Sequence, residues 1–464
     1  MAKAKSKKIT LEEALVPVEE QPYKVPGNWC WVKLRVLLAE IKNGTTIKQD
    51  KSGEGYSVTR IESIQNQKID SNRLGTIVDS NAIKETDWYQ AGDIAMSHIN
   101  SVDHVGKTAM ITEDMLPLVH GMNLLRLRFY ECCLPKYFQY FTQSYQYKDE
   151  ILKRINMAVN QVSINQKQVG TLEFPLPPLA EQRRIVEQIE GLLSKLDEVK
   201  EKIECLLDSK KVRCNSVLNK AFTGKLTAKW RENNNIKFET WEYINFEKII
   251  VEGPQNGMYK PKTSYGSGTK ILRIDCFYDG KLEPLEKLKR LEITDEEKHT
   301  YLLSVNDIVV NRVNSMPYLG KSALIRKLPE QCVFESNMMR IKINIRKANP
   351  EYVIRYLNSS IGLQELRKNA KQAVNQASIN QQDVKMVKIA LPSLEEQNEI
   401  VKIITSISNK DEAILNKAEA VIEEIDLMKK SILAKAFRGE LGTNISKEKN
   451  SIEVLKKLIE EESK

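Results

Sequence analysis

The sequence has few of the residues from which metal centres and disulfide frameworks are built. Its 464 residues include only four histidines and seven cysteines, and no two cysteines have the Cys-x-x-Cys spacing. No combination of them has the spacing of a zinc site, and unpaired thiols in odd number are typical of a reduced compartment. No run of 18 apolar residues is present, and the basic first ten residues lead into a charged segment rather than the apolar core of a signal peptide. We therefore expect a cytoplasmic protein without a membrane span or a bound metal.

Motifs for catalysis are missing as well. The segment Gly266–Lys270 (GSGTK) lacks the spacing of a phosphate-binding loop, and we find no hydrolytic triad and no set of nuclease carboxylates. What the composition does offer is charge. Lysine and arginine number 71 against 62 acidic residues, a formal net charge of +9. This mild excess indicates a polyanionic partner without proving one.

The dominant feature of the sequence is an internal repeat. The segment NQVSINQ, which starts at Asn160, returns as NQASINQ at Asn375, a shift of 215 positions. SVLNKAFTGKLT at Ser216 meets SILAKAFRGELG at Ser431 with the same shift. Weaker anchors elsewhere repeat with shifts between 212 and 215, while the residues between them differ. A period of this length indicates two homologous halves with a shared scaffold and diverged surfaces.

Each half contains the signals of one long helix. A Leu-Pro-x-Leu-x-Glu-Gln turn at 176–182 and 391–397 precedes it, because proline is tolerated just before a helix and not inside one. Starts near Ala180 and Glu395 are therefore expected, with ends at Gly224 and Gly439, which can adopt the left-handed conformation. Apolar residues recur with heptad spacing, which favours pairing of the two helices within the chain over pairing with another chain. The expected pairing residues are Ile185, Ile189, Leu192, Leu196, Val199, Ile203, Ile400, Ile404, Ile407, Ile414, Val421 and Ile425. An antiparallel register that places Lys210 opposite Asp411 matches charges along this seam.

The rest of each half predicts a mixed domain. In the first half, β-rich runs at 56–61, 92–99, 107–111 and 124–130 precede an aromatic-rich helix at 135–147. We expect an α+β fold in which two pseudo-repeated mixed α/β domains are separated by two long antiparallel coiled-coil helices. The expected segments are a flexible N-terminal arm (1–25), the first domain (26–175), the first helix (176–230), the second domain (231–390), the second helix (391–442) and a polar C-terminal tail (443–464).

One segment is close to a catalytic motif. Residues Asn349–Tyr352 read Asn-Pro-Glu-Tyr, similar to the Asn-Pro-Pro-Tyr motif of adenine methyltransferases. Its counterpart in the first half, Leu134–Tyr137, keeps the proline and the tyrosine but not the asparagine. A helix that begins with proline in its first turn explains the pattern, so we predict no catalytic site.

Polar side chains in predicted loops indicate binding instead. Asn, Gln, Arg, Lys, Ser and Thr hold phosphates and read base edges. Alternatively, each of these residues is solvated surface, and Asn-Gly forms a tight turn. The repeated Asn-Gln-x-Ser-Ile-Asn loop either contacts nucleic acid or caps the long helix. The candidate DNA-binding residues are Lys42, Asn43, Thr45, Thr46, Lys48, His98, Asn100, Gln161, Ser163, Asn256, Tyr259, Lys260, Asn311, Arg312, Asn314, Gln376 and Ser378.

The chain resembles the specificity subunit of type I restriction-modification systems from Pro26 to Leu441. The most specific carriers are LPPLAEQRRIV at Leu176, LPSLEEQNEIV at Leu391 and the two Lys-Ala-Phe-x-Gly endings. The resemblance implies two target-recognition domains that each read half of an asymmetric, split site in double-stranded DNA. It also implies two modification (methyltransferase) subunits docked on the helices and restriction (translocase and nuclease) subunits attached through them. The chain itself would then have no active site and no cofactor, and the partners would bind S-adenosylmethionine, ATP and Mg. The alternatives are a stand-alone DNA-binding regulator and a fused DNA methyltransferase.

Overall fold

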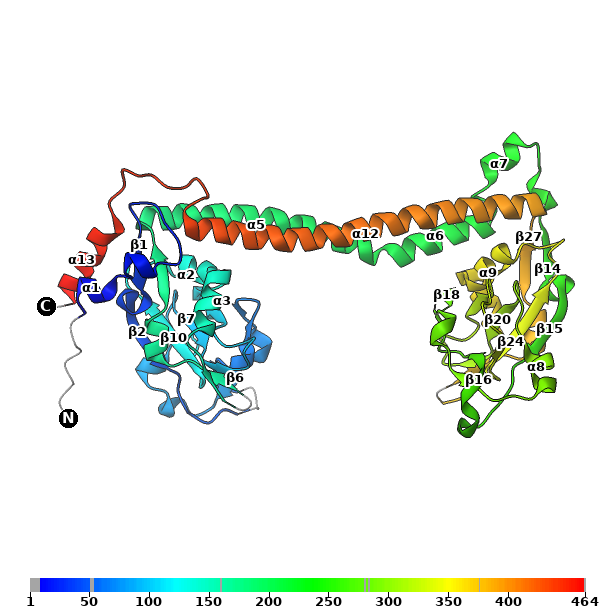
Figure 1. Ribbon diagram of the computed structural model, residues 1–464, viewed down its shortest axis with the longest axis horizontal. Helices are drawn as coiled ribbons and strands as arrows, with labels where there is room; N and C mark the ends of the chain where they lie inside the picture. Colours follow the sequence, from blue (N-terminus) through cyan, green and yellow to red (C-terminus); the bar gives the residue numbers. More distant parts are fainter. Residues whose placement is uncertain are drawn as a thin grey trace. The chain divides into compact units, whose positions relative to one another are not determined.

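The protein consists of two compact units, each built around one mixed domain (Figure 1). A computed structural model describes residues 9–50, 54–158, 161–278, 281–282, 284–374 and 376–462. The first unit comprises residues 1–203 and 420–464, and the second comprises residues 204–419. Each unit therefore contains its domain together with parts of both long helices.

A four-stranded antiparallel sheet forms the centre of the first domain, with the strand order β2-β10-β7-β9. These strands are β2 (Leu38–Asn43), β7 (Ile94–Ser97), β9 (Thr108–Met110) and β10 (Leu124–Phe129). Short strands surround it: β1 (Cys30–Lys33), β3 (Tyr56–Val58), β4 (Ile64–Gln65), β5 (Lys68–Ile69), β6 (Gly75–Ile77), β8 (Ile99–Asn100), β11 (Asn156–Met157), β12 (Val162–Ser163) and β13 (Glu173–Leu176). The predicted β-rich runs are thus confirmed, although the strands are shorter than the runs.

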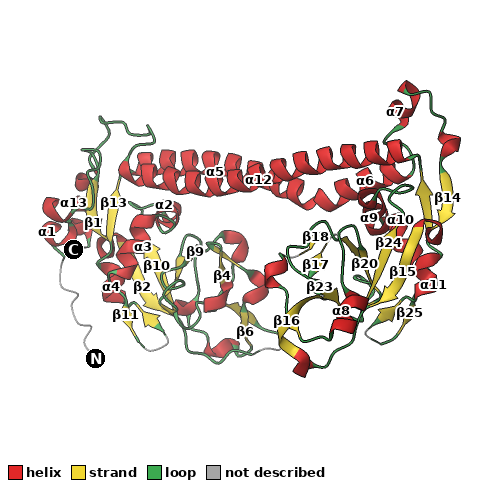
Figure 2. Cartoon of the chain, turned by 45° about the vertical axis from the view of Figure 1, so that its right-hand side comes forward, coloured by secondary structure: helices red, strands yellow, loops and turns green. Residues whose placement is uncertain are grey.

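The second domain repeats this sheet with the order β15-β24-β20-β22. Its strands are β15 (Ile250–Asn256), β20 (Ile308–Asn311), β22 (Ser322–Leu324) and β24 (Met338–Ile343). The remaining strands are β14 (Glu242–Asn245), β16 (Tyr265–Leu272), β17 (Phe277–Tyr278), β18 (Lys281–Leu282), β19 (Arg290–Leu291), β21 (Val313–Asn314), β23 (Cys332–Phe334), β25 (Lys371–Gln372), β26 (Ala377–Ser378) and β27 (Lys388–Leu391). Figure 2 shows the strands of both domains in yellow. The α+β architecture with two pseudo-repeated domains is confirmed.

Aromatic helices complete the core of the first domain. The predicted helix over 135–147 is two helices, α2 (Pro135–Phe141) and α3 (Tyr145–Leu152), because the Ser144 side chain accepts from the Tyr147 N–H and starts a new helix. Phe138, Phe141 and Tyr147 are buried in one cluster with strand residues of the sheet. The remaining short helices are α4 (Gln166–Gly170) in the first unit, and α7 (Ala228–Asn233), α8 (Asp295–Tyr301), α9 (Pro350–Asn358), α10 (Ser360–Arg367) and α11 (Gln381–Lys385) in the second.

The long helices begin and end close to the predicted residues. They are α5 (Leu179–Asp208), α6 (Lys210–Phe222) and α12 (Leu394–Arg438), so the first predicted helix is interrupted at Ser209. Gly224 and Gly439 have φ values of +74° and +73°, which are left-handed as expected of residues that close a helix.

The helices pair antiparallel within the chain, as predicted. In the first unit, Lys200 binds Asp426 at 3.0 Å and Asp197 pairs with Lys429. Residue numbers therefore increase along α5 in the direction in which they decrease along α12. In the second unit, Asp411 forms its ion pair with Arg213 at 3.1 Å. Asp411 is therefore paired with Arg213, three residues along the helix from the expected partner Lys210.

The predicted seam of α12 is only partly correct. Leu415 and Ile425 are 6% and 3% exposed and lie in the seam, whereas Ile414 is 50% exposed. The other predicted seam residues with large exposure are Val199, Ile407 and Val421, whereas Leu192, Leu196 and Ile203 are half-buried. Apolar residues occur here in adjacent pairs such as Ile414–Leu415, so the sequence fits two heptad phases. The four residues at the helix starts share a core with their domains: Ile185, Ile189, Ile400 and Ile404.

The chain ends pack together on the first domain. Residues 1–8 lie outside the described residues, but α1 (Leu11–Ala14) is capped by Thr10, and Leu15 bridges Val32 of β1. α13 (Ser451–Glu461) contacts α1 and buries Leu455 completely. The described part of the arm and the C-terminal tail thus both pack on the first domain, and the flexibility of the arm stays a prediction. Burial of the apolar faces of both segments explains this packing.

Candidate nucleic-acid interface

The repeated Glu-Gln pair anchors each domain to the start of its long helix. The indole N–H of Trp29 donates to Glu181 at 2.7 Å, and that of Trp241 donates to Glu396 at 2.9 Å. The next residue repeats the pattern, because Gln182 accepts from the Leu134 N–H at 2.7 Å and Gln397 accepts from the N–H preceding α9 at 2.8 Å. Burial raises the pKa of Glu181, and the hydrogen bonds from Trp29 and Asn444 oppose this shift. The motif thus positions each domain and leaves no free carboxylate for chemistry.

The methyltransferase-like segment has a structural role. The Asn349 side chain accepts from the Glu351 N–H at 2.8 Å as the cap of α9, with Pro350 in the first turn. Its amide also donates to Asn398 at 2.7 Å. These contacts agree with the interpretation of Asn349–Tyr352 as a helix start.

The repeated Asn-Gln-x-Ser-Ile-Asn loops do not cap the long helices. Asn165 caps α4 and Asn380 caps α11, each with a reciprocal capping box. Ser163 and Ser378 lie on β12 and β26, the central strands of two equivalent three-stranded sheets. Asn160 and Asn375, the first residues of the loops, lie outside the described residues. The loops therefore carry Gln161 and Gln376 on the exposed surface next to β8 and β21.

Three predicted residues of the first domain line one cavity of about 410 Å³. They are Asn43 at the end of β2, His98 between β7 and β8, and Ser163 on β12. Burial lowers the pKa of His98, and the nearby Asn123 backbone opposes this shift, so the ring is neutral near pH 7. The loops of three separate strands thus converge on a polar cavity, as a nucleic-acid interface requires.

The second domain brings together the equivalent residues. Arg312 lies between β20 and β21, as His98 lies between β7 and β8, and Asn256 ends β15. The Ile379 N–H donates to the Arg312 carbonyl at 2.9 Å, as the Ile164 N–H donates to the His98 carbonyl at 2.9 Å. Asn100 and Asn314 occupy the second positions of β8 and β21. Both domains therefore share this backbone arrangement, with the same asparagines but with His98 in one domain and Arg312 in the other.

Other predicted residues are engaged within their domains. Lys42 donates to the Thr86 carbonyl at 2.7 Å and pairs with Asp87, and Lys260 pairs with Glu297 at 2.8 Å. Asn311 is only 1% exposed and belongs to β20, so it does not lie in a surface loop as expected. The Thr45 backbone bridges Gly121, whereas Thr46, Lys48 and Tyr259 are exposed. None of these residues lines the 410 Å³ cavity. Their role in DNA binding stays a prediction.

Sequence reasoning missed two polar residues of this cavity, Gln166 and Lys167. They directly follow the repeated loop and correspond to Gln381 and Gln382 at the shift of 215. An extension of the candidate loop, which ended at Asn165, by two positions would have included them.

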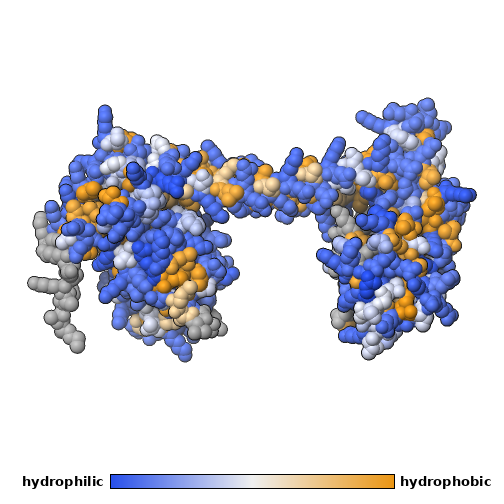
Figure 3. Space-filling model, in the orientation of Figure 1, coloured by the Kyte–Doolittle hydropathy of each residue, from blue (hydrophilic) through white to orange (hydrophobic). Residues whose placement is uncertain are grey.

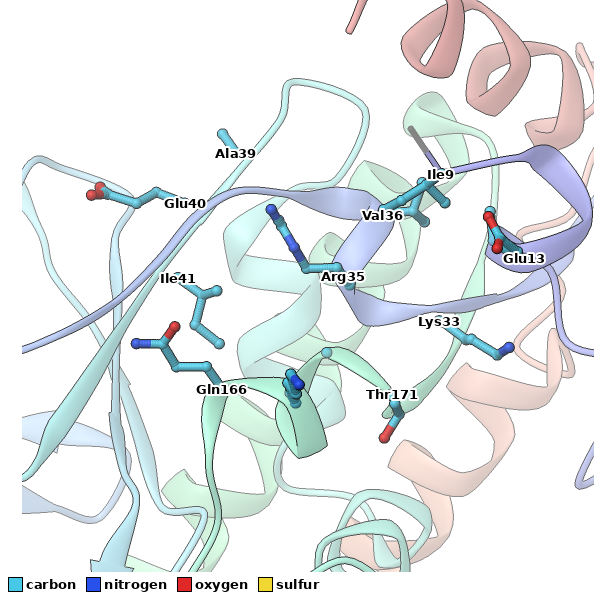
Figure 4. A pocket seen from close by; sticks show the side chains of 13 residues that line it. Ile9, Glu13, Lys33, Arg35, Val36, Ala39, Glu40, Ile41, Gln166 and Thr171 are labelled. Carbon is cyan, nitrogen blue, oxygen red and sulfur yellow. The ribbon is translucent and has the colours of Figure 1, made fainter. Parts of the chain in front are cut away.

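A larger cavity of about 730 Å³ lies between the N-terminal segment and the first domain. Figure 4 shows Ile9 and Glu13 on one side, and Arg35, Gln166 and Thr171 on the other. It contains none of the predicted DNA-binding residues. Within the described ranges no three His, Cys, Asp or Glu side chains cluster as metal ligands, and no helix is long and apolar enough to cross a membrane.

The comparisons with known proteins agree with this arrangement. The family model for the type I restriction modification DNA specificity domain matches residues 29–207 and 218–424. A Methanocaldococcus jannaschii relative, named as the type I restriction enzyme MjaX specificity subunit, is 32% identical over 90% of this chain and 95% of its own. The EcoKI specificity subunit of Escherichia coli K12 is 28% identical over 90% of each chain.

Solved structures share the fold. The crystal structure of the HsdS subunit from Thermoanaerobacter tengcongensis aligns with a TM-score of 0.61 at 19% identity, covering 91% of this chain and all of that one. A chain from a study of complex assembly in the type I R-M system aligns with a TM-score of 0.65 at 19% identity, covering 90% of this chain and all of that one. The protein belongs to the DNA specificity family of type I restriction-modification systems and is a DNA-recognition subunit.

Proposed function

We propose that the chain reads an asymmetric, bipartite site in double-stranded DNA, one half with each domain, and directs adenine methylation and restriction by partner subunits. The observation that carries this proposal is the pair of equivalent polar sites on one repeated scaffold, with His98 in one and Arg312 in the other. Equivalent loops that differ at a few side chains are suited to reading two different sequences. The relatives named above are specificity subunits of type I restriction enzymes, which supports the same role here.

The chain itself has no catalytic role in this proposal. The segment closest to a catalytic motif caps α9, and the buried carboxylates Glu181 and Glu396 hold tryptophan side chains. S-adenosylmethionine, ATP and Mg would bind to the modification and restriction subunits. The complex would act in the cytoplasm, where its DNA is located.

The modification subunits would dock on the long helices. The α12 residues that the seam leaves out recur at intervals of seven, which places them on one face of that helix. They are Ile407, Ile414, Val421 and Met428, which are 36%, 50%, 38% and 43% exposed. Figure 3 shows such hydrophobic side chains set among hydrophilic ones along the helices. A partner helix that buries this face would complete a bundle, and restriction subunits would attach to the same assembly.

Co-purification from the native cell, followed by sequencing of methylated bases in its genome, tests this function. We expect two copies of a methyltransferase subunit per chain and one methylated adenine motif with two different halves around a fixed spacer. The purified chain alone should methylate nothing, whereas a fused methyltransferase would. A chain that purifies without a methyltransferase and regulates a promoter would instead support a stand-alone regulator.

A further inference from the structure

The two domains can be compared position by position within this one chain. Asn43 lies opposite Leu125 in the β2–β10 ladder, and Asn256 lies opposite Met339 in the β15–β24 ladder. Ile99 lies opposite Ser163, and Val313 lies opposite Ser378. These registers establish the equivalent positions independently of sequence alignment.

Most of the equivalent positions carry the same side chain. Asparagine occupies 43 and 256, serine occupies 163 and 378, and glutamine occupies 166 and 381. Residues that are identical in both domains cannot distinguish two half-sites, whereas amide and hydroxyl groups readily contact phosphate and sugar. The positions that differ are His98 against Arg312, Lys167 against Gln382, and the apolar pair Ile99 against Val313.

His98 and Arg312 also contain unused polar atoms. Nδ1 of His98 and Nε of Arg312 are buried and have no hydrogen-bond partner within the described ranges. Arg312 is anchored at another atom, because its Nη1 donates to the Ser336 carbonyl at 3.0 Å. Buried polar atoms in folded proteins almost always have a partner. A side chain that is fixed on one side with an unused group on the other is therefore suited to a ligand.

We propose that residues 98 and 312 are the specificity-determining pair, which reads one base pair in each half-site, whereas the shared Asn, Ser and Gln hold the sugar–phosphate backbone. This inference rests on the proposed function. Since Arg312 Nη1 is occupied and Nε is buried, Nη2 is the donor left for a base, and guanine is the base that arginine contacts most often. The second half-site then contains a guanine at this position. A neutral imidazole has one N–H donor and one acceptor nitrogen and no planar fork, so His98 would select a different base in the first half-site.

Exchange of the two residues in the full chain, co-expressed with its modification subunit, tests the pair. R312H should relax the requirement for guanine at one position of one half-site by about 5- to 150-fold in methylation rate. H98R should introduce a guanine preference at one position of the other half-site, with no change elsewhere. R312K keeps the charge but loses the fork, so it should relax the same position while total DNA affinity falls little.

Matched variants separate base reading from backbone contact. N43A and S163A should weaken binding to all duplexes equally and leave the motif unchanged. If R312H and R312K methylate the original motif with its original stringency, the pair does not determine specificity. Equal loss of affinity for every duplex in R312H would place Arg312 on the backbone and would also overturn the inference. Failure of the proposed function is distinct, because the unaltered complex would then methylate no bipartite motif.

Discussion

Each domain has one buried glutamate that collects hydrogen bonds from segments far apart in the chain. Glu396 accepts from Trp241, from Thr227 at 2.6 Å and from Arg231 at 2.5 Å. Glu181 accepts from Trp29, and from Asn444 at 2.7 Å, but from no arginine in the described part of the chain. The same motif residue therefore forms an ion pair with a buried arginine in the second domain, whereas in the first domain it accepts hydrogen bonds from neutral donors.

Alanine substitution of these glutamates should destabilise the two units unequally. E396A leaves the 9%-exposed Arg231 side chain without its ion-pair partner, so we expect the second unit to lose about 3–5 kcal/mol of unfolding free energy. E181A, the matched control, should lower the unfolding free energy of the first unit by about 1–3 kcal/mol. Urea titrations read by hydrogen exchange of peptides from each unit would measure both. Equal losses would show that Arg231 finds another partner.

A buried histidine makes the first domain sensitive to acid. His120 is fully buried, its Nε2 lies 3.0 Å from the Leu124 carbonyl, and its ring is 5.0 Å from that of Tyr89. Burial and the nearby charge of Arg126 lower the pKa of His120 to about 3. The neutral ring therefore stabilises the fold fully above the unfolded pKa of about 6.5, and this contribution is lost as the pH falls from there towards 3.

The H120Q variant should reveal this dependence. Wild type should be more stable than H120Q at pH 7, and its advantage should shrink by up to about 1.4 kcal/mol for each pH unit below 6.5. Urea titrations at pH 7, 6 and 5, with pulse labelling of peptides from 94–129 at one fixed pH, would measure the difference. An advantage that stays constant over this range would contradict a neutral buried ring.

At the scale of elements, adjacent residues of α12 face different surroundings. L415A removes a 6%-exposed side chain from the helix seam, so we expect the unfolding free energy to fall by about 2–5 kcal/mol. I414A, its matched control, alters a 50%-exposed side chain and should change stability by less than about 0.5 kcal/mol. Under the proposed function, I414A should weaken association with the modification subunit instead. The opposite order of stability effects would restore the seam predicted from the sequence.

Local signals predicted the helices well, whereas choices that depend on packing were less predictable. Proline before α5 and α12 and glycine after α6 and α12 fixed the helix ends to within a residue or two, because their backbone preferences are local. The seam phase was not determined, because the pair Ile414–Leu415 fits two phases. Likewise, the capping of α4 by Asn165 was not predicted. α4 has five residues, which is too short for a helical pattern of apolar residues in the sequence. Of the candidate interface, Asn43, His98 and Ser163 were predicted together, but the engagement of Lys42 by Asp87 requires the tertiary structure.

At the scale of the whole molecule, the two domains should be exchangeable separately. Replacement of residues 26–171 by those of a relative should change one half of the methylated motif and leave the other half and the spacer intact. The reason is that each domain forms a separate compact unit with its own polar site. Methylome sequencing of the chimaera would measure this. A change in both halves of the motif would contradict the proposal that each domain reads one half.

The terminal segments tie the first unit together and should act on it alone. Asn444 donates to Glu181, Arg184 forms a bidentate pair with Glu448 at 2.8 Å, and the completely buried Leu455 packs in the domain core. Truncation after Gly442 removes these contacts, so burial of Leu455 alone predicts a loss of about 1.5–3 kcal/mol. Hydrogen exchange should increase in residues 10–34 and 181–189, because α1 loses α13 and Glu181 loses a donor, and it should stay unchanged in residues 204–419.

E448Q, the matched control, breaks only a partly exposed ion pair and should change exchange little. Increased exchange in both units would mean that the terminal segments stabilise the chain by a route other than these contacts.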